Sequence, residues 1–178
     1  VLKVSPDGRN YDSLANLNQT GTPKGIARAD ELSLVVWASE DGSVYRTRTS
    51  MSREQGAAPT PVERIIANLT APFDIDIAPT LGRIFISDPT AGKIYVSDLE
   101  GGGLSEWKTV AGVHGLDVVE DLEHVYYTAG SAVYRAPIDN ATASTLVAGN
   151  FTLALRVAVD PLATTEAIYV ADFGDDTI

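Results

Sequence analysis

Two aspartates, Asp76 and Asp117, stand at the same position in two related apolar segments of the 178-residue sequence. Paired carboxylates can bind a hard cation such as Ca²⁺, which prefers oxygen ligands, and His114 directly precedes the second segment. The matching positions of two further segments hold Ala27 and Ala158, so a ring of ligands would be incomplete. The alternative role is ordinary hydrogen bonding to backbone or water. The sequence therefore gives a candidate calcium site at Asp76 and Asp117 and assigns no catalytic residue.

Asparagine offers a second chemistry, because four of the six asparagines of the chain lie in Asn-X-Thr sequons. These are Asn18, Asn68, Asn140 and Asn150. Such sequons accept N-linked glycans on surface loops of secreted proteins. The alternative is that asparagine serves as a turn residue. The number of sequons favours a secreted glycoprotein.

Composition excludes several other classes of function. The chain has 13 Lys and Arg residues against 24 Asp and Glu, a net charge of −11. A nucleic-acid-binding protein would show a basic face, and contact with an anionic membrane surface is disfavoured for the same reason. Cysteine is absent from the sequence, which removes disulfides and thiol nucleophiles. No apolar run approaches the ~18 residues of a membrane span, and the serine-hydrolase, P-loop and Rossmann motifs do not occur.

The elements that must position these side chains are strands that recur every 40 to 50 residues. Innermost strands are expected at 25–29, 74–78, 115–119 and 156–160, and each is followed by a second strand with an aromatic residue. The matching aromatic residues are Trp37, Phe85, Tyr126 and Tyr169. Short alternating strands separated by Gly- and Asp-rich turns predict an all-β propeller of four-stranded antiparallel blades.

The repeat divides the chain into units 1–22, 23–70, 71–110, 111–152 and 153–178 of a single propeller domain. About four repeats are present, and both ends fall at equivalent points of the repeat. Either four blades close into a ring, or the chain is an arc of a larger ring. We favour the arc, because such blades form rings of more than four. Asn18, Asn68 and Asn150 then lie before innermost strands, and Asn140 lies on the opposite face.

These repeats resemble the YWTD (LDL-receptor class B) and NHL families of β-propeller. The resemblance is carried by Ile168-Tyr169-Val170-Ala171-Asp172, by Ile84-Phe85-Ile86-Ser87-Asp88-Pro89 and by the run Asp98-Leu99-Glu100-Gly101-Gly102. It implies a six-bladed ring, in which Asp88 and Asp172 are structural residues that hold neighbouring turns together. Glu40 is a near match to this aspartate, and Ala129 departs from it.

The resemblance and the sequons together favour a secreted or cell-surface, N-glycosylated module that binds a protein partner or the remaining part of the same propeller. No cofactor is required, although Ca²⁺ stays a candidate. One alternative is a calcium-dependent hydrolase of the gluconolactonase or strictosidine synthase type, with Asp76, Asp117 and His114 near the channel. A third is an intracellular NHL-type scaffold in which the sequons are accidental.

Overall fold

The computed structural model describes residues 2–4, 11–13, 20–49, 61–162 and 167–174. In these ranges the chain is built of antiparallel strands and turns, and η1 (Glu120–Leu122) is a single 3-10 turn. The predicted all-β class with four-stranded antiparallel blades is confirmed. Among the described residues there is no helix with the length and apolar character needed to cross a bilayer.

In the described residues, three sheets have four strands each and form complete blades, with two strand pairs beside them. The first blade consists of β3 (Pro23–Ala29), β4 (Leu34–Ser39), β5 (Ser43–Arg48) and β6 (Glu63–Ile66). The second consists of β7 (Asp74–Ala78), β8 (Arg83–Asp88), β9 (Lys93–Asp98) and β10 (Ser105–Thr109). The third consists of β11 (Val113–Val119), β12 (His124–Ala129), β13 (Ala132–Pro137) and β14 (Thr145–Gly149). The pairs are β1 (Leu2–Val4) with β2 (Tyr11–Ser13), and β15 (Ala154–Asp160) with β16 (Ala167–Asp172).

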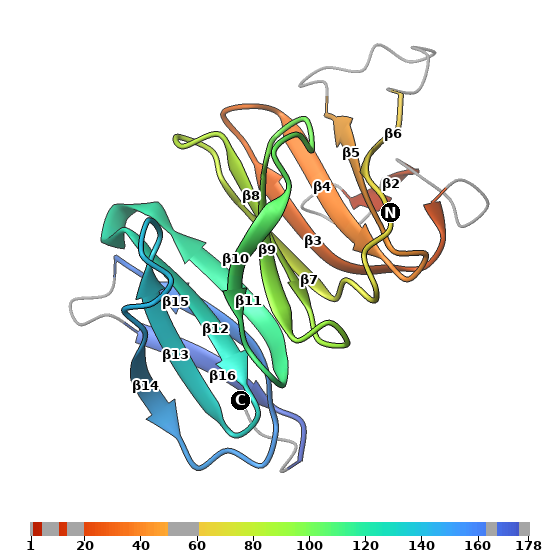
Figure 1. Cartoon of the computed structure of the whole chain (residues 1–178). Coiled ribbons are helices and arrows are strands. Elements are labelled where there is room, and N and C mark those ends of the chain that lie inside the picture. Colours follow the sequence, from red (N-terminus) through yellow and green to blue (C-terminus); the bar gives the residue numbers. More distant parts are fainter. Residues whose placement is uncertain (1, 5–10, 14–19, 50–60, 163–166, 175–178) are drawn as a thin grey trace.

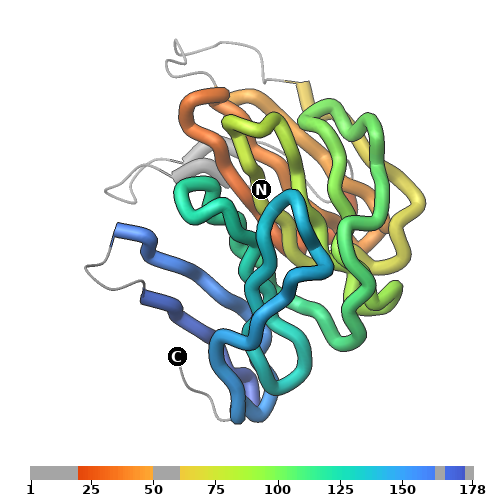
Figure 2. Tube along the Cα trace, turned by 60° about the vertical axis from the view of Figure 1, so that its left-hand side comes forward, coloured from red at the N-terminus to blue at the C-terminus, as the bar shows by residue number. Residues whose placement is uncertain are grey.

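The blades fan around a common axis in chain order (Figure 1). The innermost strands β3, β7, β11 and β15 lie side by side in that sequence. Figure 2 shows the blue pair β15–β16 at one end of the arc and the orange first blade at the other. We call the end of the blades where the innermost strands begin the entry face, and the end where they finish the exit face. Antiparallel connections place Asn68 and Asn150 on the entry face and Asn140 on the exit face.

Separate apolar clusters fill the seams between neighbouring blades. Val36 packs with Ile84 and Ile86 between the first and second blades, and Phe85 packs with Tyr127 between the second and third. Tyr126 continues the pattern between the third blade and β15. The second strands β8 and β12 therefore have neighbouring blades on both faces, which explains why they are almost continuously buried.

The register of the strands corrects one expectation about the aromatic repeat. Phe85, Tyr126 and Tyr169 pair with Asp76, Asp117 and Ala158 of the innermost strands. The equivalent pair in the first blade is Val36 with Ala27, whereas Trp37 pairs with Ile26.

Trp37 therefore points to the opposite face of its blade, where it stacks on Tyr45 with ring centroids 5.9 Å apart. The alignment of Trp37 with Phe85 was wrong by one residue, because it matched side-chain type instead of register. The same shift makes Ser39, and not Glu40, the counterpart of Asp88.

Candidate functional site

Asp76 and Asp117 use their carboxylates to join neighbouring innermost strands. Oδ2 of Asp76 accepts the backbone N–H of Val118 at 2.7 Å, and Oδ2 of Asp117 accepts that of Val159 at 2.6 Å. Oδ1 of Asp76 also accepts the N–H of Ile77 at 2.8 Å. Each aspartate thus braces its own blade to the next one.

The two carboxyl groups also face each other. Burial raises the pKa of Asp76 to about 7, and the neighbouring Asp117 charge and hydrogen bond act in the same direction. Burial raises the pKa of Asp117 as well, against the lowering effect of the Val159 N–H and of the bond to Asp76. With a pKa of about 7, the Asp76 carboxyl is partly protonated at neutral pH.

This arrangement does not fit the expected calcium site. Ca²⁺ takes six to eight oxygen ligands, and in the described part of the chain no three acidic or histidine side chains converge into a metal-binding group. The oxygens that would bind the cation already accept three backbone N–H groups. We derive no chemistry through a metal at Asp76 and Asp117.

A cluster of aromatic and charged side chains lies on the entry face where the innermost strands begin. We call it the entry cluster: Phe73, Asp74, His114 and Arg156. Arg156 of β15 forms an ion pair with Asp74 of β7, and its guanidinium carbon lies 4.7 Å from the centroid of the Phe73 ring. Phe73 in turn meets the His114 ring edge to face, with centroids 5.5 Å apart. The cluster therefore combines side chains from three successive blades.

Arg156 extends beyond its partner toward the first blade. Its Nη2 donates to the carbonyl oxygen of Lys24 in β3 at 3.3 Å. Asp74 is only 6% exposed, and burial raises its pKa while Arg156 and the N–H of Leu116 oppose that shift. The carboxylate thus depends on Arg156 for much of its charge compensation.

His114 lies at the entry face and the channel carboxylates have other partners. Its Nδ1 is 3.1 Å from the carbonyl oxygen of Gly112, and its ring packs on Phe73. Asp117 instead bonds to Val159 and Asp76. Different partners hold the imidazole and the two carboxylates, so the structure gives no acid–base pair between them.

Of the entry cluster, the sequence pointed to His114 and not to Phe73, Asp74 or Arg156. Arg156 carried a signal that could have been used. It occupies the position of Asp74 two repeats earlier, because Val157 matches Ile75 in register. Opposite charges at equivalent positions of two innermost strands were a signal that could have identified this ion pair.

Asp88 and Asp172 lie buried at the ends of second strands. Oδ2 of Asp88 accepts the N–H groups of Thr70 and Ala71 at 2.8 and 3.1 Å. Asp172 accepts those of Thr152 and Leu153 at 2.8 and 2.7 Å. Both carboxylates therefore anchor the loop that enters their own blade. In the first blade Ser39 replaces the aspartate, and its Oγ donates to the carbonyl oxygens of Thr20 and Thr22.

Three of the four sequons fall within the described residues, and Asn18 lies outside them. Asn68, Asn140 and Asn150 are all exposed. Asn68 and Asn150 have φ of 66° and 69°, in the left-handed region that asparagine tolerates better than most residues. Local backbone conformation therefore accounts for two of the asparagines. It does not account for the threonines that complete the sequons.

No protein-family model matches the sequence, and the comparison with characterised proteins finds no relative. Among solved structures, the chain is similar to one in the crystal structure of a nidogen/laminin complex, with a TM-score of 0.79 and 15% identity. The chain has the β-propeller fold. The match covers 96% of this chain and 65% of that chain.

A second similar structure is a putative 6-phosphogluconolactonase from Bacteroides uniformis. Here the TM-score is 0.62 and the identity 10%, over 96% of this chain and 56% of the other. Identities this low concern the fold alone. The chain thus spans about two thirds or less of the propellers that it resembles.

Proposed function

We propose that the chain is part of an extracellular, N-glycosylated propeller that binds another protein through its entry face. The observation that carries this proposal is the entry cluster, in which Arg156 lies over the ring of Phe73 beside His114. Aromatic residues and arginine supply most of the binding energy at protein interfaces. The cluster is half-buried and held from three blades, so it presents these groups in a fixed arrangement.

The sequons support the extracellular part of the proposal. Thr70 and Thr152 are exposed, and their backbone N–H groups bond to Asp88 and Asp172. Any residue except proline supplies that N–H, so the threonine hydroxyls are left for another role. Acceptance of a glycan at Asn68 and Asn150 would explain both members of each sequon.

The ends of the arc support a longer ring. Ile26 of the first blade is 55% exposed, and Tyr169 and Phe173 at the other end are 55% and 67% exposed. Large apolar side chains in such numbers mark surfaces that a further element covers. We propose that additional blades of the same propeller cover them, in line with a six-bladed ring.

Glycosylation is tested by intact-mass analysis of native material before and after treatment with peptide N-glycosidase. We expect a mass loss, with conversion of Asn68, Asn140 and Asn150 to aspartate. Thr70→Ala is the matched control in secreted recombinant protein, because it removes one sequon and leaves the left-handed Asn68 in place. Unmodified asparagines in native material would overturn the extracellular assignment.

Partner binding is tested with Phe73→Ser on the entry cluster and Leu146→Ser on β14, where Leu146 is 63% exposed away from the cluster. A protein captured from extracellular fluid should bind the Phe73→Ser variant about 30-fold more weakly, as for a typical interface anchor of ~2 kcal/mol. Leu146→Ser should bind like the parent chain. Equal binding by the parent chain and both variants would refute the entry face as the binding surface.

The effect of Ca²⁺ on stability distinguishes the hydrolase alternative from the proposed binding module. Because the described carboxylates serve as braces, we expect the same melting temperature in Ca²⁺ and in chelator. A calorimetric binding signal together with stabilisation by Ca²⁺ would favour the hydrolase instead.

A further inference from the structure

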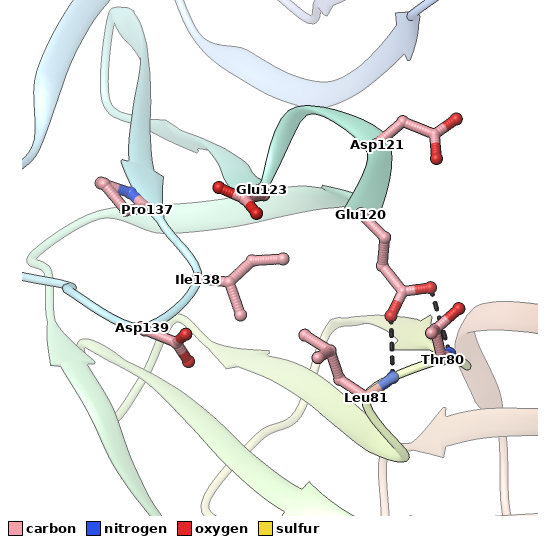
Figure 3. A pocket seen from close by; sticks show the side chains of 8 residues that line it. All are labelled: Thr80, Leu81, Glu120, Asp121, Glu123, Pro137, Ile138 and Asp139. Atoms are coloured by element: carbon pink, nitrogen blue, oxygen red, sulfur yellow. Dashed lines mark hydrogen bonds between the residues drawn. The ribbon is translucent and has the colours of Figure 1, made fainter.

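A groove follows the seam between the second and third blades on the exit face. Its central pocket, of about 360 Å³, is lined by residues of the β7–β8 turn, of η1 and of the β13–β14 loop (Figure 3). An inner cavity of about 270 Å³ shares Glu120 and Asp121 with this pocket. An outer cavity of about 510 Å³ shares Leu81, Ile138 and Asp139 with it. We call these three cavities the seam groove; they extend from the axis of the arc to its rim.

The central pocket combines apolar and acidic side chains. Leu81 and Ile138 face each other across it, and Leu81 is 47% exposed. The carboxylate of Glu120 is already bound, because it accepts the N–H groups of Thr80 and Leu81 at 3.1 and 2.9 Å.

Three other carboxylates line the same pocket, and that of Asp121 points away from Leu81 and Ile138 (Figure 3). That of Asp139 pairs with Arg83 at 2.9 Å. The Glu123 carboxylate has no hydrogen-bond or ion-pair partner among the described residues, and it lies beside Ile138. Of the two lining carboxylates without a partner among the described residues, Glu123 is thus the one placed beside the apolar side chains, where it can receive a ligand.

The backbone at Glu123 gives an independent reason to single out this residue. The same turn occurs in all three complete blades, with the N–H of Ser33, Gly82 or Glu123 donated to the carbonyl oxygen three residues earlier. The turn requires a left-handed residue, and φ is 50° at Ser33, 64° at Gly82 and 55° at Glu123. Glutamate costs about 1 kcal/mol in this conformation, and glycine does not. Glycine would fit position 123 without this cost, so the strained backbone singles out Glu123 as a candidate functional residue.

Charge along the seam groove identifies the ligand class. Among its described lining residues the one basic side chain is Arg83, against several acidic ones. The acidic residues are Asp98, Asp117, Glu120, Asp121, Glu123 and Asp139. A lysine or arginine side chain matches the central pocket, because its aliphatic stem can lie between Leu81 and Ile138 while its charge meets Glu123.

We infer that the seam groove binds an extended segment of a protein partner, and that the central pocket takes a lysine or arginine side chain of that segment on Glu123. The inference rests on the proposed role in protein binding and adds the chemistry of the partner and a second contact face. Three cavities in a row suit a peptide segment better than a single small molecule.

The test is an NMR titration of the whole ¹⁵N-labelled chain with Nα-acetyl-arginine amide and with Nα-acetyl-lysine amide. Nα-acetyl-norleucine amide is the matched probe, because it has an unbranched apolar side chain and no charge. We expect saturable shifts of the amides of Leu81, Glu123 and Ile138 with at least one basic probe, and none with norleucine. Equal shifts with norleucine, or no saturable shift with either basic probe, would overturn the inference.

Two variants of Glu123 separate binding from folding. Glu123→Gln keeps the shape and removes the charge, and should weaken binding of the basic probe about tenfold or more, as expected for a charge-assisted hydrogen bond. Glu123→Gly should abolish binding and leave the melting temperature unchanged or higher, because it relieves the left-handed strain.

Unweakened binding by either variant would refute the role of Glu123. The small-molecule probes need no partner protein and no glycan. A negative titration would therefore leave the entry-face proposal intact. A positive titration would likewise stand if the entry-face proposal failed.

Discussion

Oδ2 of Asp76 accepts the backbone N–H of Val118 at 2.7 Å, which joins the innermost strands of two neighbouring blades through a side chain. Asp117 repeats this bond with Val159 at 2.6 Å, and each pair is separated by 42 residues. The shared separation follows from the repeat. At the two remaining equivalent positions, Ala27 and Ala158 offer no acceptor, so these braces connect the second, third and fourth repeats.

Removal of one brace should destabilise the arc. Asp117→Ala leaves the Val159 N–H without its acceptor, and we expect the free energy of unfolding to fall by about 1–3 kcal/mol. Urea denaturation measures this change. Asp121→Ala, at an exposed position of η1, is the matched control and should stay within about 0.5 kcal/mol. Equal effects of the two substitutions would show that the brace contributes nothing to stability.

The pKa of Asp76 predicts a pH dependence with a definite sign. An unfolded aspartate titrates near 3.9, whereas burial raises the pKa of Asp76 to about 7 in the folded chain. Between these values the folded chain binds more protons, so this group's stabilising contribution is complete below pH 4 and is lost as the pH rises through 7.

Asp76→Asn removes this titratable group, so the free energy of unfolding should fall less steeply with rising pH than it does in the parent chain. The stability of the parent chain relative to Asp76→Asn should decrease by at least about 1 kcal/mol between pH 4.5 and 7.5. Urea denaturation at several pH values gives the comparison. Parallel curves for the two proteins, or a difference that grows with pH, would contradict the assigned direction.

The fold could be predicted from the sequence because the same pattern of strands and turns recurs in successive repeats. Each copy of the second strand carries the same apolar run, and each following turn carries glycine or aspartate, so errors in one repeat are corrected by the others. The one shift in alignment arose in the first blade, where Trp37 and Glu40 resemble Phe85 and Asp88 by type and differ from them by one position in register. Residue type alone cannot fix a register, because a shift of one residue exchanges the two faces of a strand.

The sites were less predictable, because they depend on contacts between repeats. Asp76 and Asp117 were singled out correctly as an equivalent pair, but the N–H groups that they bind belong to the next blade. The entry cluster needs Arg156 to approach Asp74 across 82 residues of chain. The seam groove depends on how two blades pack, and no local pattern around Leu81 or Ile138 indicates it.

Glycine at position 115 should be required for blade packing. A Cβ atom added to Gly115 would lie 2.7 Å from the Cα atom of Arg156, a backbone contact that only movement of the blade can relieve. We expect Gly115→Ala to lower the free energy of unfolding by about 1–3 kcal/mol. Gly149→Ala is the matched control, because its added Cβ meets nothing closer than 4.0 Å. If thermal denaturation finds both variants equally stable, the third blade and β15 are not in close contact at this point.

The ion pair between Arg156 and Asp74 should show coupling in a double-mutant cycle. Arg156→Gln leaves a carboxylate that is 6% exposed without its counter-charge. The Arg156 side chain is 38% exposed, so solvent screens the pair and the expected loss of stability is about 1–2 kcal/mol. Asp74→Asn removes the charge from the other side and keeps an acceptor for the N–H of Leu116.

In the double variant the Asn side chain at position 74 is neutral and needs no counter-charge. Arg156→Gln should therefore lower the free energy of unfolding less in the Asp74→Asn background than in the parent chain. We expect a coupling energy of at least about 0.5 kcal/mol from urea denaturation of the four proteins. The loss caused by Arg156→Gln alone should also grow as the pH rises, because a higher pH favours the uncompensated carboxylate. Additive effects, with the same loss at pH 4.5 and 7.5, would mean that Arg156 acts through its contact with Phe73 and not through charge.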